Sequence, residues 1–217
     1  MIDPKYKAPQ KRSRASPIVS SDAYVLLDLP GFRFSDVDLE IINQSEAGEN
    51  YARILYTLAC RCLSGSDVCV VLEVGTGGSS ITFAKALNKS NSGGGLSRLY
   101  SVEIDLNRPT IQDVEIVNSL GVDWRTVHGD SLKVPLDKLP SVVDMLYIDG
   151  DHGGDHSIGD YRRFSPLVRA GGLIVYDDYP LFSGPEAAVA TLVAEGLSGT
   201  RLTYNVSDGN SFYVIQK

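Results

Sequence analysis

The sequence has 217 residues, of which 43% are hydrophobic and 22% charged, and its formal net charge is −7. This length and composition predict an ordinary water-soluble protein with one sizeable hydrophobic core. No stretch approaches the roughly 20 apolar residues that a membrane span needs, and the N-terminus has no apolar signal-peptide core, so we expect a soluble, cytoplasmic protein.

Positive charge gathers at the N-terminus. Residues 1–20 contain five Lys or Arg and one Asp, a local charge of +4 that leaves −11 for the rest of the chain. The acidic remainder argues against broad binding to a nucleic-acid backbone, which needs clustered Lys and Arg. We expect residues 1–22 to form a flexible basic arm and residues 23–217 to form a single domain. Contact between this arm and nucleic acid or an anionic surface is the alternative.

The three cysteines are Cys60, Cys62 and Cys69. They are odd in number and lack a second ligand pair at zinc spacing. We expect them to be small buried side chains in a reducing compartment.

Short apolar runs alternate with segments of helical periodicity from residue 45 onward. Residues 24–43, which precede them, are mixed in character and are interpreted as an accessory element. Strands are predicted at residues 68–74, 99–104, 124–128, 143–148, 172–176, 201–206 and 211–215. Helices are predicted at residues 45–63, 79–87, 109–120, 157–168 and 185–195. The last two strands flank Ser207-Asp208-Gly209-Asn210, a sequence typical of a hairpin turn.

This alternation predicts an α/β fold. We expect a Rossmann-like, doubly wound and mostly parallel seven-stranded sheet, with an antiparallel C-terminal hairpin and helices on both faces. In such a sheet, ligands bind at the carboxyl ends of the strands. The polar residues that follow each strand are therefore the candidates for function.

A glycine-rich turn, Glu73-Val74-Gly75-Thr76-Gly77-Gly78-Ser79-Ser80, follows the first predicted strand. Glycine permits the dihedral angles of a tight turn and lets a ligand approach the main chain. Ser80 stands where dinucleotide-binding turns have their third glycine. The Glu73 carboxylate would attract an ammonium group but repel a pyrophosphate. A nicotinamide site and a turn without ligand are the alternatives.

Acids also follow the next two strands. Glu103, 28 residues after Gly75, stands where a carboxylate can accept hydrogen bonds from both hydroxyls of a ribose, and Asp105 competes for this role. After the third strand, Asp130 and Ser131 could accept from the amine of an adenine. A simple turn is the alternative there.

The most informative cluster lies after the fourth and fifth strands, where Asp149-Gly150-Asp151-His152 and Asp177-Asp178 are found. Neighbouring strands would bring the carboxylates of Asp149, Asp177 and Asp178 together. Like charges at short distance need a cation or protons between them, and oxygen-only ligands suit Mg²⁺, Ca²⁺ or Mn²⁺. Helix capping or solvation of these acids is the alternative.

Two histidines follow Asp149. His152, beside a metal-bound hydroxyl, would serve as a general base at neutral pH. His156 lies four residues later, but the intervening glycines make a shared helix face doubtful.

These motifs, in this order and spacing, resemble those of class I S-adenosylmethionine-dependent methyltransferases over residues 44–217. The resemblance is closest to the subgroup of catechol O-methyltransferase and the sugar O-methyltransferases of macrolide and cephamycin pathways. In that subgroup, a stretch like Tyr147-Ile148-Asp149-Gly150-Asp151-His152 precedes one like Gly171-Gly172-Leu173-Ile174-Val175-Tyr176-Asp177-Asp178 by some twenty residues.

The resemblance implies roles for individual residues. The methionine part of S-adenosylmethionine would be bordered by Glu73, Gly75, Thr76, Gly77 and Ser80. Glu103 would hold the ribose, Asp130 and Ser131 would border the adenine, and Asp149 would also contact the cofactor. The cation, expected to be Mg²⁺, would be held by Asp149, Asp177 and Asp178. His152 and Asp149 would be the catalytic residues.

This chain departs from the family pattern at three places. The catechol enzyme has an asparagine where this chain has Asp178, and a lysine base where it has His152. Gly153-Gly154-Asp155 replaces a Ser-Tyr-Glu-like stretch.

The resemblance implies an O-methyltransferase for a small hydroxylated acceptor, with a metal that activates the hydroxyl. A sugar, a catechol-like phenol, a nucleoside or another metabolite would fit. The alternatives are a metal-independent methyltransferase, an NAD-dependent oxidoreductase and a non-enzymatic partner subunit. We expect no membrane or nucleic-acid partner. The oligomeric state is open, and a homodimer is one option.

Overall fold

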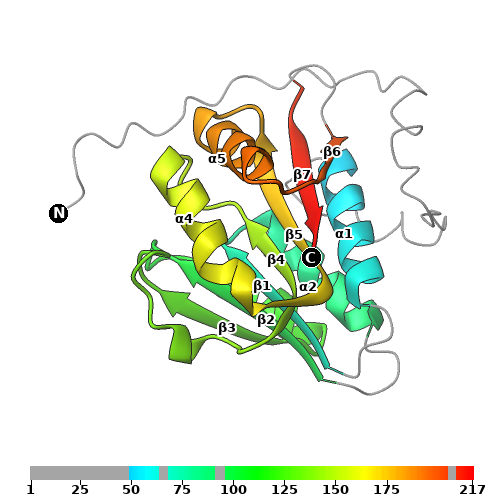
Figure 1. Cartoon of the computed structure of the whole chain (residues 1–217). Helices are drawn as coiled ribbons and strands as arrows, with labels where there is room; N and C mark the ends of the chain where they lie inside the picture. The colour runs from blue at the N-terminus through cyan, green and yellow to red at the C-terminus, as the bar shows by residue number, and fades with distance from the viewer. Residues whose placement is uncertain (1–48, 64–67, 91–95, 205–208) are drawn as a thin grey trace, which may run out of the picture.

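A seven-stranded sheet crosses the middle of the molecule in this computed structural model, which describes residues 49–63, 68–90, 96–204 and 209–217 (Figure 1). The strands are β1 (Val68–Val74), β2 (Leu96–Glu103), β3 (Asp123–His128), β4 (Val143–Ile148), β5 (Val168–Tyr179), β6 (Thr200–Thr203) and β7 (Ser211–Gln216). The helices are α1 (Glu49–Leu63), α2 (Gly78–Ser90), α3 (Ile111–Ser119), α4 (Gly154–Phe164) and α5 (Ser183–Ala194). The expected basic arm and accessory element lie outside the described residues.

The strand order confirms the predicted fold class. It is β3-β2-β1-β4-β5-β7-β6, with the first five strands parallel and β7 antiparallel to both β5 and β6. The order reverses between β1 and β4. Val74 at the end of β1 pairs with Val102 and Ile148, so three strands end at the same level. A reversal of this kind opens a crevice at the carboxyl ends of the strands.

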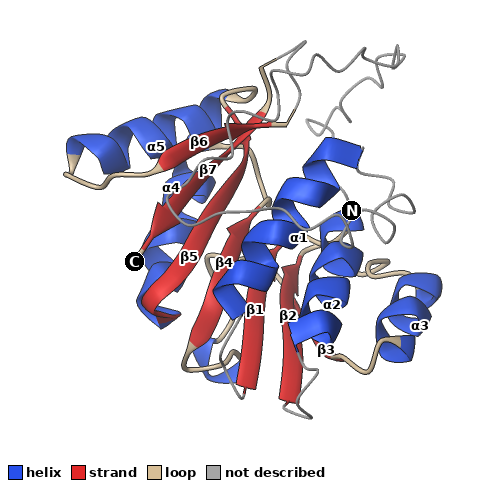
Figure 2. Cartoon of the chain, turned by 90° about the vertical axis from the view of Figure 1, so that its right-hand side faces the viewer, coloured by secondary structure: helices blue, strands red, loops and turns tan. Residues whose placement is uncertain are grey.

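Helices cover both faces of the sheet, as predicted. One core cluster joins α1, α2 and α3 to the sheet, and the other joins α4 and α5 to its opposite face (Figure 2). Along β1, Cys69 and Val71 face the first cluster, whereas Val70 and Leu72 face the second. Burial on both faces explains why the strands appear in the sequence as continuous apolar runs.

Several boundaries differ from the predictions. α4 begins at Gly154 because Gly153 is extended and acts as its N-cap, and it ends at Phe164, before a 3₁₀ turn that contains Pro166. β5 continues beyond residue 176 to Tyr179, because its pairing with β7 resumes after a register shift. Asp177 and Asp178 therefore lie within the last three residues of β5 and not after the strand. Residues 45–48 of the predicted first helix lie outside the described residues.

No helix in the described ranges is long and apolar enough to span a membrane. The three cysteines, all within the described residues, form no disulfide; Cys62 and Cys69 are buried and Cys60 is half-buried.

A buried carboxylate ties four elements together at the amino-terminal edge of the sheet. Asp144 in β4 accepts a hydrogen bond from the amide of Val70 at 2.8 Å and from Arg169 Nε at 2.6 Å. Arg169 also donates to the carbonyl of Cys62 at the end of α1, at 2.8 Å. Asp144 is buried, so its charge depends on these partners.

We predict that Asp144→Ala lowers the free energy of unfolding by about 2 kcal/mol, because a buried amide and an arginine lose their acceptor. Urea denaturation measures this loss. The matched control is Asp123→Ala, which removes the half-exposed partner of Arg125 and should have a much smaller effect. Equal losses in the two variants would contradict this account.

Candidate active site

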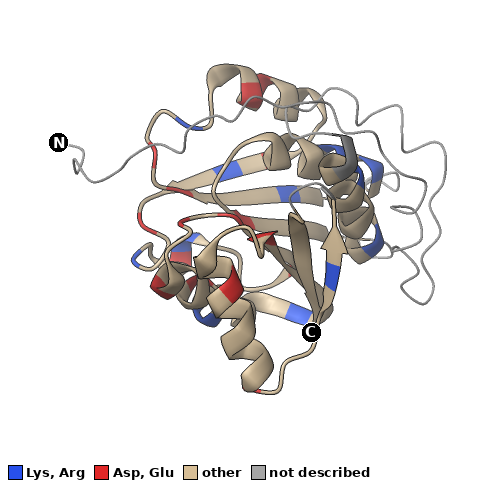
Figure 3. Cartoon of the chain, turned by 90° about the horizontal axis from the view of Figure 1, so that it is seen from above, with Lys and Arg blue, Asp and Glu red and all other residues tan. Residues whose placement is uncertain are grey.

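Acidic residues concentrate at the carboxyl ends of the central strands. Figure 3 shows red segments at the arrowheads of these strands, where the sheet order reverses. The residues predicted from the sequence meet here from β1, β2, β4 and β5.

The turn after β1 lies directly against the loop after β4. Gly75 has a φ of +91°, and a Cβ on it would collide with the carbonyl oxygen of Asp149. The amide of Asp149 donates to the carbonyl of Val74 at 3.1 Å. The glycine is thus needed for the approach of another loop as well as for the turn itself, and it brings Asp149 beside the turn.

Glu73 lies beneath this turn. Its side chain is fully buried and accepts hydrogen bonds from the hydroxyls of Ser79, Ser80 and Ser101 at 3.2, 2.6 and 2.5 Å. Burial raises the pKa of Glu73 to about 7. Ser80 also accepts from the amide of Gly77 at 3.2 Å, so the serine at the third glycine position helps to hold the turn. Contact between Glu73 and a cofactor ammonium stays a prediction.

Glu103, the last residue of β2, lies beside the glycine turn. Its carboxylate accepts from the amide and the hydroxyl of Thr76 at 2.9 and 2.6 Å, and from the amide of Asp105 at 2.8 Å. These bonds hold Glu103, and not Asp105, against the glycine turn. Arg108, which the sequence reasoning missed, donates to the carbonyl of Thr76 at 3.1 Å and lies beside Gly77.

The loop after β3 is tied to Glu103 by the amide of Gly129, which donates to the Glu103 carbonyl at 2.8 Å. Asp130 accepts from Lys133 at 2.7 Å and from the amide of Leu132 at 3.0 Å, and the bond from Lys133 lowers its pKa. The Asp130 carboxylate therefore stabilises the loop to which it belongs. Ser131 is half-buried beside it.

The fourth and fifth strands bring Asp149, His152 and Asp178 together. One ligand atom from each lies within 4.8 Å of the others, and His152 Nε2 is 2.8 Å from Asp178 Oδ2. Burial and the charges of Asp177 and Asp178 raise the pKa of Asp149 well above its usual range. A cation among these groups would relieve that repulsion, so the residues present fit a divalent metal.

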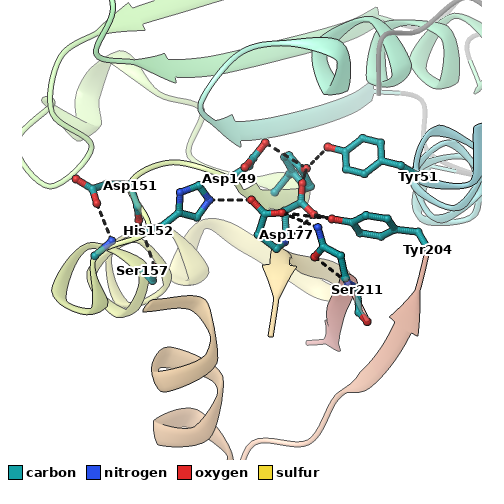
Figure 4. Close-up of polar contacts among 12 residues, drawn as sticks. Tyr51, Asp149, Asp151, His152, Ser157, Asp177, Tyr204 and Ser211 are labelled. Atoms are coloured by element: carbon teal, nitrogen blue, oxygen red, sulfur yellow. Dashed lines mark hydrogen bonds and ion pairs between the residues drawn. The ribbon is translucent and has the colours of Figure 1, made fainter. Parts of the chain in front are cut away.

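Asp177 is held by tyrosines. It accepts from the hydroxyls of Tyr147 and Tyr204 at 2.5 and 2.7 Å, and burial raises its pKa to about 6. Tyr51 from α1 contacts the Tyr147 hydroxyl, and Figure 4 shows Tyr51 and Tyr204 approaching the acids from the side opposite His152. Asp177 is the expected metal ligand that is not part of the cluster of Asp149, His152 and Asp178, and tyrosine hydroxyls engage both of its oxygens.

Asp178 has a φ of +55°, in the left-handed region that Asp tolerates better than most residues. Asn210 donates to it at 2.9 Å. Burial opposes its ionisation, but the hydrogen bonds from His152 and Asn210 lower its pKa. Tyr204 and Asn210 were missed from the sequence, because their approach depends on how the C-terminal strands pair.

His152 is fixed on two sides. Its ring stacks on Phe182, with centroids 4.2 Å apart and planes at 23°, and a Cβ on Gly184 would collide with its carbonyl oxygen. His156 lies within α4, 3.9 Å from Asp130 and 4.0 Å from Asp151. The two histidines therefore face different groups.

Comparisons with known proteins agree with this architecture. A family model described as a methyltransferase domain matches residues 72–179. An O-methyltransferase from Bacillus cereus in complex with SAH has a TM-score of 0.60 and 23% identity, over 90% of this chain and 96% of that one. A putative O-methyltransferase from Klebsiella pneumoniae (TM-score 0.58, 20% identity) and TomG from Streptomyces achromogenes (0.56, 19%) match over the same shares. These likenesses establish the fold.

A curated relative is the uncharacterized protein R132 of Acanthamoeba polyphaga mimivirus. It is 48% identical over 55 residues, which is a quarter of each chain.

The segment matched by the family model runs from β1 to the end of β5. It contains the glycine turn at Gly75, the acid at the end of β2 and the acids that converge after β4 and in β5. Residues 72–179 therefore carry a methyltransferase domain, and the chain has the fold of the O-methyltransferases named above.

Proposed function

We propose that the chain transfers a methyl group from S-adenosylmethionine to a hydroxyl oxygen of a small acceptor, with the help of a divalent cation. The observation that carries this proposal is the convergence of Asp149, His152 and Asp178 beside the turn at Gly75. The three similar structures named above carry the description O-methyltransferase, in one case putative, which supports oxygen as the acceptor atom.

The cofactor would lie along the ends of β1 and β2. Glu103 is already oriented by Thr76, which occupies both lone pairs of Oε2. Oε1 accepts from the amide of Asp105 and has a further lone pair for a ribose hydroxyl, and a second ribose hydroxyl would replace that of Thr76 at Oε2. Gly75 and Gly77 would let the methionine part approach the main chain. Asp149, beside the turn, would face the positively charged part of the cofactor and stabilise it there.

Asp149 and Asp178 would hold the cation. Asp177 completes the expected set and would join it by exchanging one tyrosine hydrogen bond, whereas His152 is already within reach. Bound there, the cation would lower the pKa of an acceptor hydroxyl.

His152 would take the proton of that hydroxyl. Asp178 holds Nε2, which leaves the other ring nitrogen as the acceptor, and Phe182 fixes the plane of the ring. The oxygen then forms a bond to the methyl carbon as the carbon–sulfur bond breaks, and S-adenosylhomocysteine is released. The chain contributes mainly alignment, because the sulfonium is already reactive.

A metal-independent transfer is the second candidate. It is favoured by the hydrogen bonds that Asp177 and Asp178 already receive from Tyr147, Tyr204, His152 and Asn210, which stabilise their charges without a cation.

We predict that Asp149→Ala weakens Mn²⁺ binding more than about tenfold, because a ligand charge is lost. Titration calorimetry in the presence of S-adenosylhomocysteine measures the affinity, and Mg²⁺ competes in a second titration. The matched control is Asp151→Ala, an exposed acid two residues away, which should bind as the wild type does.

Two further variants identify the third ligand. If Asp177 supplies it, His152→Ala keeps the affinity for Mn²⁺ and Asp177→Ala loses it; the reverse result assigns His152. Absence of Mn²⁺ binding by the wild-type protein, or equal binding by Asp149→Ala, would favour the metal-independent reaction.

We predict that Glu103→Gln weakens the binding of S-adenosylhomocysteine by about tenfold or more, because the acceptor for the ribose hydroxyls loses its charge. Calorimetry measures the dissociation constant, and NAD is titrated in parallel. Glu115→Gln on the exposed side of α3 is the control and should bind normally. Binding of NAD in place of S-adenosylhomocysteine would overturn the proposed cofactor.

A further inference from the structure

Asp160 is a buried carboxyl that the proposed reaction does not use. It lies in α4 with an exposed fraction of 0%, and neither carboxylate oxygen has a hydrogen-bond partner among the described residues. Asp155, five residues earlier in the same helix, is exposed. Burial of an unpartnered carboxyl is costly, so this position is not explained by the stability of α4 alone.

The Asp160 carboxyl lies between the loops that follow β3 and β4. Its Oδ2 is 3.5 Å from the point where a Cβ on Gly150 would be. Gly159, its neighbour in α4, packs so closely on Leu132 that a Cβ there would be 2.7 Å from Leu132 Cδ2. Leu132 is the neighbour of Ser131, so the loop after β3 packs on α4 beside Asp160, and the loop after β4 approaches the same carboxyl.

Burial is the largest influence on this carboxyl and raises its pKa to about 6. The Ser131 hydroxyl and the imidazole of His156 act in the opposite direction, whereas Asp130 and Asp151 add to the effect of burial. Above that pKa the carboxylate is an acceptor, and the Ser131 hydroxyl is a neutral donor beside it.

The loop that carries Ser131 is bonded to the residue proposed to hold the ribose. The amide of Gly129 is bonded to the carbonyl of Glu103, so the loop after β3 is adjacent to the ribose acid. Asp130, the other polar residue of this loop, is engaged by Lys133 and Leu132. Of these two neighbouring side chains, Ser131 would therefore be the one to meet the base of a nucleoside.

We propose that Asp160 is a positioning residue for the adenine end of the cofactor and acts through Ser131. The carboxylate accepts the hydroxyl hydrogen of Ser131, which turns the lone pairs of that oxygen toward the crevice, where they accept from the exocyclic amine of adenine. This inference rests on the proposed function, and it makes Asp160 a determinant of the preference for adenine.

The test uses the full chain at pH 8 and titration calorimetry with two ligands, S-adenosylhomocysteine and S-inosylhomocysteine, which has a carbonyl in place of the amine. Asp160→Leu should weaken S-adenosylhomocysteine binding by about tenfold, the loss of one oriented hydrogen bond, and the inosine analogue much less. Asp160→Asn, whose amide oxygen can still accept from Ser131, should keep most of the preference for S-adenosylhomocysteine over the inosine analogue. Asp155→Asn is the matched control and should change nothing.

Ser131→Ala is the second variant, at a half-buried position. It should lose the same preference for adenine, and Asp160→Leu combined with Ser131→Ala should be no worse than Ser131→Ala alone, because both remove one interaction. If Asp160→Leu does not fold, Ser131→Ala by itself tests the proposed hydrogen bond to adenine.

A purely structural role would lower the melting temperature and weaken both ligands equally, and that result overturns the inference. Unchanged adenine preference in Ser131→Ala also overturns it. Both results require that the wild type binds S-adenosylhomocysteine. If it does not, the proposed function itself fails, and the inference with it.

Discussion

The approach of the Gly75 backbone to the carbonyl of Asp149 is the constraint on which the rest of the site depends. It joins the turn that would receive the cofactor to the loop that carries the acids, and any side chain at Gly75 would force them apart. The hydrogen bond from the amide of Asp149 to Val74 fixes the same junction. β1 and β4 end at the same level of the sheet. The proposed cofactor site and the proposed metal site therefore share one crevice.

The crevice is rich in acids, and the chain stabilises them mainly with neutral donors. Glu73 is surrounded by serine hydroxyls, and Asp177 by tyrosine hydroxyls. Hydrogen bonds of this kind keep carboxylates in place without neutralising their field. Burial raises the pKa of Glu73, Asp149 and Asp177, and a sulfonium or a cation bound among them would favour their ionised forms. Asp178 differs, because its partners include the imidazole of His152.

The sequence predicted the sheet and the convergence of Asp149 with Asp178, because continuous apolar runs mark buried parallel strands and the ends of such strands meet. It did not predict the partners of Asp177. Tyr204 reaches that acid only through the antiparallel pairing of β6 with β7, which no local pattern specifies. The burial of Asp160 could not be predicted from the sequence either, because it depends on which face of α4 the loop after β3 covers.

The C-terminal pair of strands has a consequence for how this fold can be recombined. Tyr204 follows β6 and Asn210 precedes β7, and both donate to the acids at the end of β5. A chimera that takes β5 from this protein and the last two strands from a relative without these residues would remove one donor from each of the two acids. β5 and the pair β6–β7 therefore have to match one another. Exchange of either part alone should impair the site even when the sheet is complete.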